Sequence, residues 1–493
     1  MYSFFERKYS MSYRKYAKIM SGLLALLLLS ASCQSSVDDG GQVTSSVPDS
    51  DAATEETTSY LETIPVYDFG GADFRLLVNS QSDRPNLHAG ELNGEVINDA
   101  MYNRDQTVAE MYNLNFVYTA YDTRGELYSD VSRLITAGED CGEVIITSLT
   151  DGIGDFALNG MLSDLNAYDA LSLESEWWCQ SMNETMTTGD KIYATTGPMA
   201  LCYAYSPYAF FVNLTMADEW GLEDVYSLVE SGDWTIDKMN ELMKNSYSDS
   251  DGDGVPSVGD SFGLTTTHEA GKAFYIGCGM RMAEKTPDGA ELLIDSPMSI
   301  EVLDKLHGIM TNEYVFCTET IGTSANTGDY KTLLFTNSQT LFCAAPIQWG
   351  VLNFRDMNDD YGILPYPKYD TNQTEYYSHI NPFFPVGIAI PVTNQKPDET
   401  AAVMEALAYI SNSEMLPKIN EVVLKEKIAR DEKSKEMLDL LYENMVVDLN
   451  CVYDFAGSAT KLRLYAIGQS DNFSSEYASI KEKAESELAK MLE

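Results

Sequence analysis

Hydrophobic and polar positions alternate in blocks along the first third of the chain, and these blocks predict strands and helices in turn. Residues 74–78 form a short apolar run typical of a buried strand, and residues 115–118 and 144–147 repeat it. Apolar residues at helical spacing separate these runs; they are Ile97, Met101, Val108 and Met111, and then Leu127, Val131, Leu134 and Ile135. The alternation predicts βαβ units, and therefore a parallel sheet whose functional loops lie beyond the carboxyl ends of the strands.

Helical spacing also dominates the end of the chain. A helix is predicted to begin after Pro397 and to continue to Ile410, because apolar side chains recur there every three or four residues. Residues 437–442 and 477–491 show the same spacing. We expect these C-terminal helices to support the rest of the fold.

The N-terminus shows the pattern of an export signal. Basic residues precede an apolar run at residues 23–29, which is too short to cross a bilayer but typical of a signal peptide. Small residues at 30–32 come directly before Cys33, which resembles a bacterial lipoprotein signal, although Ser30 stands where leucine is usual. In that interpretation residues 1–32 are removed and Cys33 is lipidated. Ordinary cleavage with an unmodified Cys33 is the alternative, and either way the protein is exported.

Composition narrows the class of protein. The chain of 493 residues has 76 acidic and 32 basic side chains, a net charge of −44, which argues against a nucleic-acid partner. Hydrophobic residues make up 44% of the chain, enough for packed cores, and the length suggests two or three domains. Four histidines against 11% aromatic residues favour a binding protein over a metalloenzyme.

The cysteines do not form a recognisable framework. Besides Cys33 there are seven, widely spaced and without a Cys-x-x-Cys pair. We expect most of them to be small buried hydrophobic residues. One disulfide between two of them is the alternative. Residues 33–62 are rich in Ser, Thr, Asp and Gly, and they predict a flexible tether between the lipid and the folded body.

Several short motifs follow one another in a specific order. Residues 155–168 end in Ser-Asp-Leu-Asn-Ala-Tyr, and residues 191–194 read Lys-Ile-Tyr-Ala. Phe-Phe-Val-Asn at 210–213, Gly-Asp-Trp-Thr-Ile-Asp at 232–237 and Tyr-Gly-Ile-Leu-Pro-Tyr-Pro-Lys at 361–368 continue the series. Each motif alone is weak. Together they resemble family 1 extracellular solute-binding proteins, the lipoprotein receptors of sugar ABC importers, and in particular the clostridial type.

The resemblance implies a fold of the α/β class, periplasmic-binding-protein-like type 2, with two lobes, a hinge and C-terminal helices. Lobe 1 would comprise residues 63–209, with about 390–430 returning to it. Lobe 2 would comprise residues 210–385, with the C-terminal helices at about 431–493. The crossovers are expected near residues 208–213 and 383–390, and hinge closure around the ligand is the expected motion.

The resemblance also implies a function that is not enzymatic. The protein would act as a monomer, capture a carbohydrate, in particular an oligosaccharide, between its lobes, and deliver it to an ABC importer. It would work on the extracellular face of the bacterial cell membrane, held there only by its lipid. The permease and the carbohydrate are its expected partners.

Aromatic residues are the candidate sugar contacts, because their faces stack on the apolar face of a pyranose. Tyr203, Tyr205 and Tyr208 form a closely spaced series that we expect to present its rings on one face of an extended strand, although a half-buried sheet surface explains the series equally simply. Trp178 follows another tryptophan, and one ring of the pair could face a cleft. Trp349 ends a strand-like run near the expected cleft edge, with core packing as the alternative.

Trp234 receives a different interpretation. It stands directly before Thr235 and Asp237, which are typical of a helix start, and a tryptophan in that position is more often a core anchor than a ligand contact. We therefore predict a structural role for Trp234.

An acidic loop resembles a calcium-binding loop. Asp249, Asp251 and Asp253 supply oxygen donors at its first, third and fifth positions, the Val255 carbonyl takes the seventh, and Asp260 takes the twelfth. Asp260 replaces the usual glutamate, and its shorter side chain would weaken binding. Calcium here would stabilise a surface loop structurally. A chance acidic turn is the alternative.

Two other classes of protein remain open. A secreted glycoside hydrolase needs two carboxylates that flank the scissile bond. The chain has so many carboxylates that their number does not exclude this class. However, the chain has no His-Glu-x-x-His, P-loop or dinucleotide motif. A calcium-stabilised surface adhesin would lack a closing cleft.

Overall fold

The computed structural model describes residues 59–78, 87–250, 252–287, 289–318, 327–384, 386–421 and 428–492. The chain from Thr58 to Glu493 forms one compact unit. The predicted signal peptide, the lipidation site Cys33, most of the tether and the calcium ligand Asp251 lie outside the described residues. No helix in the described ranges is both long enough and apolar enough to cross a membrane.

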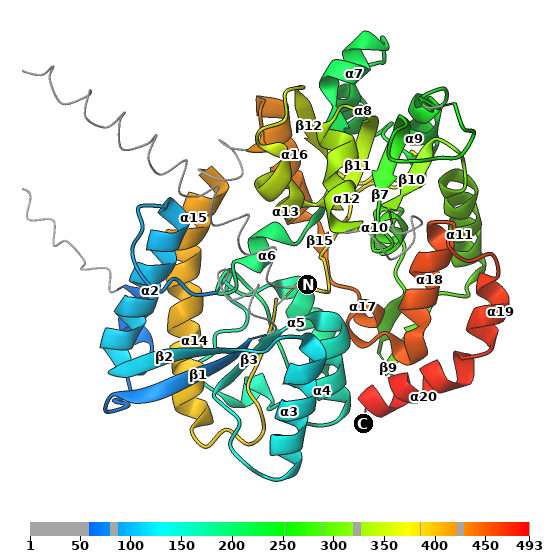
Figure 1. The fold of residues 1–493 in the computed structure, drawn as a ribbon. Coiled ribbons are helices and arrows are strands. Elements are labelled where there is room, and N and C mark those ends of the chain that lie inside the picture. Colours follow the sequence, from blue (N-terminus) through cyan, green and yellow to red (C-terminus); the bar gives the residue numbers. More distant parts are fainter. Residues whose placement is uncertain are drawn as a thin grey trace, which may run out of the picture. The chain divides into compact units, whose positions relative to one another are not determined.

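The first sheet comes from the predicted βαβ units (Figure 1). Its strands are, in the order β14-β3-β1-β2, Gly387–Ala389, Val144–Thr147, Ala72–Val78 and Leu114–Ala120. Strand β1 pairs in parallel with β2 and β3, while β14 is antiparallel to β3. Helices α2 (Val96–Tyr112) and α3 (Arg124–Thr136) make the predicted connections. These strands and helices confirm the interpretation of the hydrophobic pattern.

The second sheet is mixed. Its strands are, in the order β10-β7-β11-β6-β12, Val315–Cys317, Phe262–Thr266, Thr340–Pro346, Tyr208–Asn213 and Tyr361–Leu364. Strand β7 is parallel to β10 and β11, whereas β6 runs antiparallel to β11 and β12. The carboxyl ends of β7 and β11 therefore lie at the same edge as the start of β6.

Helices and short strands complete the described fold. The remaining helices are α4 Gly154–Leu158, α5 Gln180–Met186, α6 Cys202–Tyr205, α7 Leu214–Glu219, α8 Val225–Ser231, α9 Ile236–Met243, α10 Ala270–Gly277, α11 Pro297–Met310, α12 Thr327–Thr336, α13 Ile347–Trp349, α14 Pro397–Ile410, α15 Leu416–Lys418, α16 Glu432–Glu443, α17 Leu449–Tyr453, α18 Ser458–Ala466, α19 Phe473–Ala478 and α20 Lys481–Met491. The short strands are β4 Thr187–Thr188, β5 Lys191–Ile192, β8 Ala283–Thr286, β9 Gly289–Leu292, β13 Ser378–His379 and β15 Met445–Val446.

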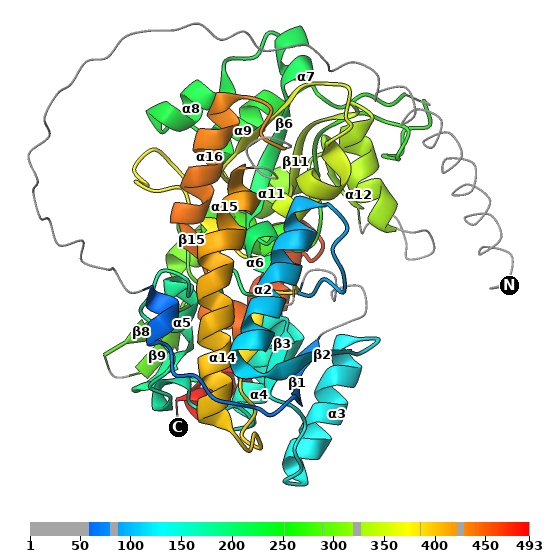
Figure 2. The ribbon, with the colours of Figure 1, turned by 90° about the vertical axis from the view of Figure 1, so that its left-hand side faces the viewer.

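The chain passes between the two sheets at several points. The first passage lies at α6, just before the predicted segment 208–213, because β6 already belongs to the second sheet. The second leads from β12 by way of β13 to β14, and its last part overlaps the predicted region 383–390. Helix α14 then packs beside α2, as Figures 1 and 2 both show, while α16 packs on β12 of the second sheet.

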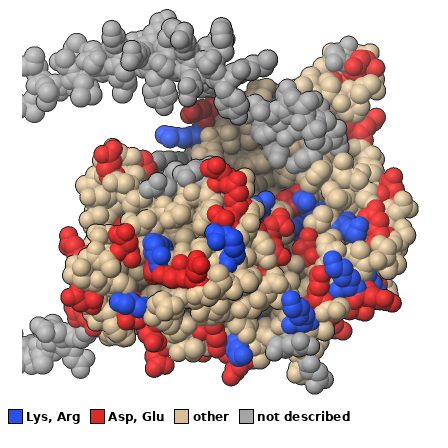
Figure 3. All heavy atoms as spheres, turned by 60° about the horizontal axis from the view of Figure 1, so that its bottom comes forward, with Lys and Arg blue, Asp and Glu red and all other residues tan. Residues whose placement is uncertain are grey.

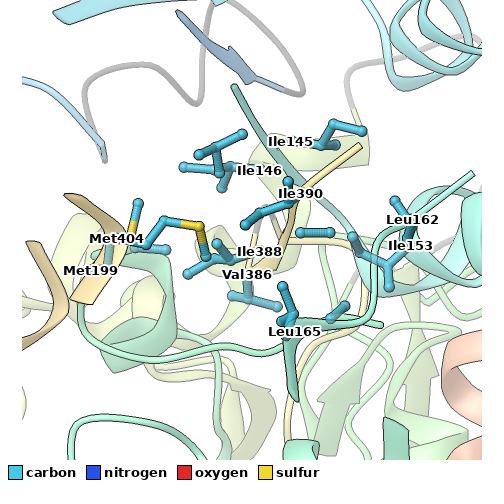
Figure 4. Packing of buried hydrophobic residues seen from close by; sticks show 14 of the residues in the cluster. Ile145, Ile146, Ile153, Leu162, Leu165, Met199, Val386, Ile388, Ile390 and Met404 are labelled. Atoms are coloured by element: carbon cyan, nitrogen blue, oxygen red, sulfur yellow. The ribbon is translucent and has the colours of Figure 1, made fainter. Parts of the chain in front are cut away.

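Each sheet has its own hydrophobic core. The core of lobe 1 centres on β3 and β14, where Ile145, Ile146 and Ile388 pack together (Figure 4). The core of lobe 2 contains Trp234, which is fully buried and donates its indole N–H to the Pro365 carbonyl at 2.8 Å. The structural role predicted for Trp234 is therefore confirmed.

The ends of the folded chain contact both lobes. Helix α18 packs on α10 and α11 of lobe 2, whereas α20 packs on α4 of lobe 1. At the other end, residues Tyr60–Thr63 form a 3-10 helix, and the Tyr60 hydroxyl donates to the Glu405 carboxylate at 2.7 Å. The packed body thus begins by Tyr60, earlier than the predicted residue 63.

The seven described cysteines are buried and form no disulfide with one another, as expected of small hydrophobic residues. Acidic side chains are spread over the face drawn in Figure 3, with basic ones between them. In that setting any local concentration of basic side chains stands out against the net charge of −44.

Candidate functional site

The carboxyl ends of the two sheets meet at one aromatic ring. Phe383 lies on the passage from β13 to β14 and is half-buried. Arg124, which begins α3 after the end of β2, places its guanidinium carbon 4.7 Å from the ring centroid. Lys272, in α10 after the end of β7, places its ammonium 5.1 Å from the same centroid. One cation from each lobe therefore contacts the ring, which marks the junction between the lobes.

A third cation completes this group, which we call the Phe383 cluster: Phe383, Arg124, Lys272, Arg463 and Glu269. The guanidinium carbon of Arg463 lies 5.8 Å from the ring centroid. Glu269 pairs with Lys272 at 2.9 Å and also with Arg463. The ammonium of Lys272 is almost fully buried, so this ion pair is shielded from solvent.

Close helix packing positions two of these cations. Gly271 precedes Lys272, and a Cβ at Gly271 would lie 2.3 Å from the Arg463 carbonyl oxygen. Only glycine therefore allows α10 and α18 to approach this closely. Burial lowers the pKa of Arg463, which the charge of Asp151 partly offsets.

The neighbouring histidine is neutral. His379 is completely buried, and burial lowers its pKa well below 6.5, with the charges of Lys272 and Arg281 acting in the same direction. It stacks against Tyr208 with ring centroids 6.0 Å apart. The junction between the lobes therefore has a positive local potential without a protonated histidine.

Trp349 lies at the carboxyl edge of the second sheet, where the sequence places it. It ends α13 directly after β11 and is half-buried. Its packing partners form a hydrophobic cluster shared by both lobes, since the cluster includes Ile97 and Met101 of α2 as well as Ala345 of β11. Among the predicted sugar contacts, Trp349 combines partial exposure with a position between the lobes.

The predicted tyrosine series is interrupted. Tyr203 and Tyr205 lie in helix α6, so they do not share the face of an extended strand with Tyr208. Pro207 separates the helix from β6, because a proline has no backbone N–H with which to continue the helical hydrogen bonds. Tyr208 and Phe210 do share a face, but it belongs to the core of lobe 2. The expectation of one continuous aromatic strand is therefore wrong.

Trp178 is also in a core rather than in a cleft. Trp177 and Trp178 are 8% and 1% exposed, and their indole nitrogens donate to the two oxygens of Glu405 at 3.0 and 2.9 Å. The expectation that one ring of this pair faces the cleft is wrong, because a single buried carboxylate holds both rings in lobe 1.

Tyr203 contributes to a pocket of about 320 Å³ beside α6, α15 and α16. The pocket is lined by Tyr203, Leu416, Asn420, Leu438, Asp439, Tyr442 and Glu443. Tyr205, by contrast, is 7% exposed and packs in the cluster shared by the lobes.

A second pocket, of about 430 Å³, lies beside α4, α17 and α20 and is mostly acidic. Its charged lining residues are Asp151, Asp155, Asp454, Glu487, Lys483 and Lys490. Burial raises the pKa of Asp155, and the neighbouring charges of Asp151, Glu487 and Asp454 raise it further. The pocket therefore disfavours additional negative charge.

The acidic loop folds around its own backbone. The Asp249 carboxylate accepts the N–H groups of Gly252 and Gly254, and Asp253 accepts that of Val255. Asp260 is fully buried and accepts from Ser250 and Ser257. Within the described part of the chain, no three acidic, histidine or cysteine side chains are grouped to hold a metal.

No protein-family model matches the chain, and no curated protein matches it. Solved structures do. An ABC substrate-binding protein from Listeria monocytogenes in complex with cycloalternan is 15% identical with a TM-score of 0.53, over 85% of this chain and 99% of that chain. A family 1 extracellular solute-binding protein from Bifidobacterium longum subsp. infantis is 14% identical with a TM-score of 0.52, over 85% and 98%.

The galacto-N-biose/lacto-N-biose I-binding protein of an ABC transporter from Bifidobacterium longum, in complex with lacto-N-biose, is 10% identical with a TM-score of 0.57, over 86% of this chain and 98% of that chain. At these identities the likeness establishes the fold. The chain has the two-lobed α/β architecture of periplasmic-binding-protein-like structures, as its sequence motifs indicated.

The sequence did not point to the Phe383 cluster. Its three cations, Arg124, Lys272 and Arg463, come from three distant segments of the chain. Within the cluster, only Glu269 and Lys272 are close together in the sequence. One usable signal was positional, since Arg124 lies between the predicted strand 115–118 and the predicted helix that carries Leu127, at the edge where α/β proteins bind ligands.

Proposed function

We propose that this protein captures a carbohydrate, in particular an oligosaccharide, between its two lobes and delivers it to an ABC importer. The observation that supports this most directly is the contact of Arg124 and Lys272 with Phe383, which places the carboxyl edges of both sheets at one junction. Ligands of open α/β sheets bind beyond these edges. Trp349 offers an aromatic face in the cluster shared by the lobes.

The likeness to sugar-binding proteins of ABC transporters supports the same function. Two of these proteins are in complex with cycloalternan and with lacto-N-biose, which are oligosaccharides. The order of the sequence motifs supports membership of family 1, and of its clostridial type. The protein would act as a monomer and not as an enzyme.

A ligand screen tests the proposal. Purified protein is melted with a panel of monosaccharides and oligosaccharides, and each hit is measured by calorimetry. A ligand at 100 times its Kd should add about 2.7 kcal/mol of stability. Chromatography of the same samples must show the sugar intact, because cleavage would instead make the protein a glycoside hydrolase. Scattering that shows no compaction with a bound sugar would favour the adhesin.

We also propose that the mature protein is anchored at the extracellular face of the membrane through a lipid on Cys33. The support is the basic, apolar and small-residue order before Cys33. Metabolic labelling with a fatty acid should mark the protein, and Cys33→Ala should abolish the label and release the protein from the membrane. Cys141→Ala, at a buried cysteine, is the matched control and should stay labelled. Normal labelling of Cys33→Ala would contradict the anchor.

A further inference from the structure

The Phe383 cluster concentrates positive charge in a strongly acidic protein. Arg124, Lys272 and Arg463 all lie within 5.8 Å of one ring centroid, although basic residues number 32 against 76 acidic ones. Glu269 is the carboxylate paired with Lys272 and Arg463. The charge of Asp151, an exposed residue that also lines the acidic pocket, acts on Arg463 as well. Three cations therefore lie around one ring, and Glu269 is the carboxylate that pairs with two of them.

Arg124 differs from the other two cations. Lys272 and Arg463 both pair with the Glu269 carboxylate, although Nε of Arg463 is buried without a hydrogen-bond partner. Arg124 has no carboxylate partner among the described residues, and its buried Nη1 has no hydrogen-bond partner there. A buried guanidinium N–H without an acceptor costs free energy, and native structures rarely leave one. The planar guanidinium binds carboxylates, sulfates and phosphates through paired hydrogen bonds. Arg124 thus lacks the kind of partner that an anionic ligand group supplies.

We propose that the carbohydrate taken up at this junction is acidic, and that Arg124 binds its anionic group while Phe383 contacts the adjoining sugar ring. This inference rests on the proposed function and specifies its substrate class. The position fits, because Arg124 comes from lobe 1 and Lys272 from lobe 2, and an anion at the ring would interact favourably with both. Closure of the lobes would then bury the charge between cations, where the interaction is strongest.

Carboxylate, sulfate and phosphate groups on a sugar all present oxyanions that Arg124 could bind. A panel of ligands distinguishes these three groups. Trigalacturonate carries carboxylates, and its full methyl ester is the same size without charge. An unsaturated chondroitin sulfate disaccharide supplies sulfate, glucose 6-phosphate supplies phosphate, and maltotriose is a neutral reference. Each is tested by thermal shift and calorimetry on the full mature chain.

The matched variants are Arg124→Gln and Arg133→Gln. Both lie in α3. Arg124 is the first residue of the helix, whereas Arg133 is exposed and lies in its last turn. We expect at least one anionic sugar to bind, its neutral counterpart to bind at least tenfold more weakly, and Arg124→Gln to remove most of that difference. Arg133→Gln should bind like the parent. Circular dichroism and melting of the variants without ligand verify that both are folded.

The outcomes separate this inference from the proposed function. Binding of neutral sugars alone, or binding of an anionic sugar that Arg124→Gln leaves unchanged, would overturn the inference and leave the proposed function standing. If no sugar of either kind binds in this panel or in the wider carbohydrate screen, both fail.

Discussion

Trp178 donates its indole N–H to the buried carboxylate of Glu405 at 2.9 Å. The same carboxylate accepts from Trp177 at 3.0 Å and from the Tyr60 hydroxyl at 2.7 Å. The Tyr60 ring also packs against Trp177 in a tilted arrangement, with ring centroids 4.7 Å apart. Glu405 therefore fastens the first folded residues of the chain and the tryptophan pair to α14.

Replacement of Glu405 should destabilise the protein without changing its affinity for the ligand. Glu405→Ala leaves both buried indole N–H groups without an acceptor and leaves the Tyr60 hydroxyl with Ser172 alone, so we expect the free energy of unfolding to fall by about 3–5 kcal/mol. Glu405→Gln keeps one carbonyl oxygen and should cost less. Urea unfolding measures the change. Glu414→Ala, at an exposed position shortly after α14, should stay within about 0.5 kcal/mol of the parent. Equal stability of Glu405→Ala and Glu414→Ala would contradict this role.

Asp448 should make stability depend on pH. It caps α17 and accepts the backbone N–H groups of Met282 and Asn450 at 2.7 and 2.8 Å. Complete burial nevertheless raises its pKa to about 6, against 3.8 in the unfolded chain. Between these values the folded state binds more protons than the unfolded state, so the contribution of Asp448 to stability falls as the pH rises from 4 to 6.

Asp448→Asn should remove this dependence. Between pH 4 and pH 7 the difference in unfolding free energy between parent and variant should shift in favour of the variant by about 2–3 kcal/mol. The measurement is urea unfolding at several pH values. Asp190→Asn, at an exposed turn, provides the control and should follow the parent at every pH. Parallel curves for parent and Asp448→Asn would mean that the carboxyl ionises normally.

Much of lobe 1 could be predicted from the sequence, because its strands are short apolar runs bounded by polar segments. The tyrosine series failed for a physical reason, since Tyr205 and Tyr208 are three residues apart and would point to opposite faces of a strand, and Pro207 divides the helix from the strand. The Phe383 cluster could not be predicted, because the contacts of Phe383 depend on how α3, α10 and α18 pack. The prediction for Trp178 failed because its hydrogen-bond partner, Glu405, lies far away in the sequence, on α14.

Calcium remains a proposal supported by the spacing of the acidic loop. The buried carboxylate of Asp260 already ties Ser250 to Ser257, and a bound ion would draw Asp249 and Asp253 toward the same centre. We expect chelation to lower the melting temperature and added calcium to restore it. Asp249→Ala should melt at one temperature in both conditions, while Asp398→Ala, in the first turn of α14, should respond like the parent. Identical melting of the parent with calcium and with chelator would make the loop an ordinary acidic turn.

Trp349 and Trp234 should separate binding from stability. Sugar hydroxyls exchange water hydrogen bonds for protein ones with little net gain, so aromatic contact must supply much of the affinity. Trp349 is half-buried between the lobes. Trp349→Ala should weaken binding of the sugar identified in the screen by about 2 kcal/mol, which is roughly a thirtyfold rise in Kd. Trp234 is fully buried against Phe210 and Phe342, so Trp234→Ala should instead lower the free energy of unfolding by about 3–5 kcal/mol. Calorimetry on each folded variant, beside urea unfolding, distinguishes the two effects. If Trp349→Ala binds the sugar like the parent, the aromatic contact must come from another ring, with Phe383→Ala as the next variant to test.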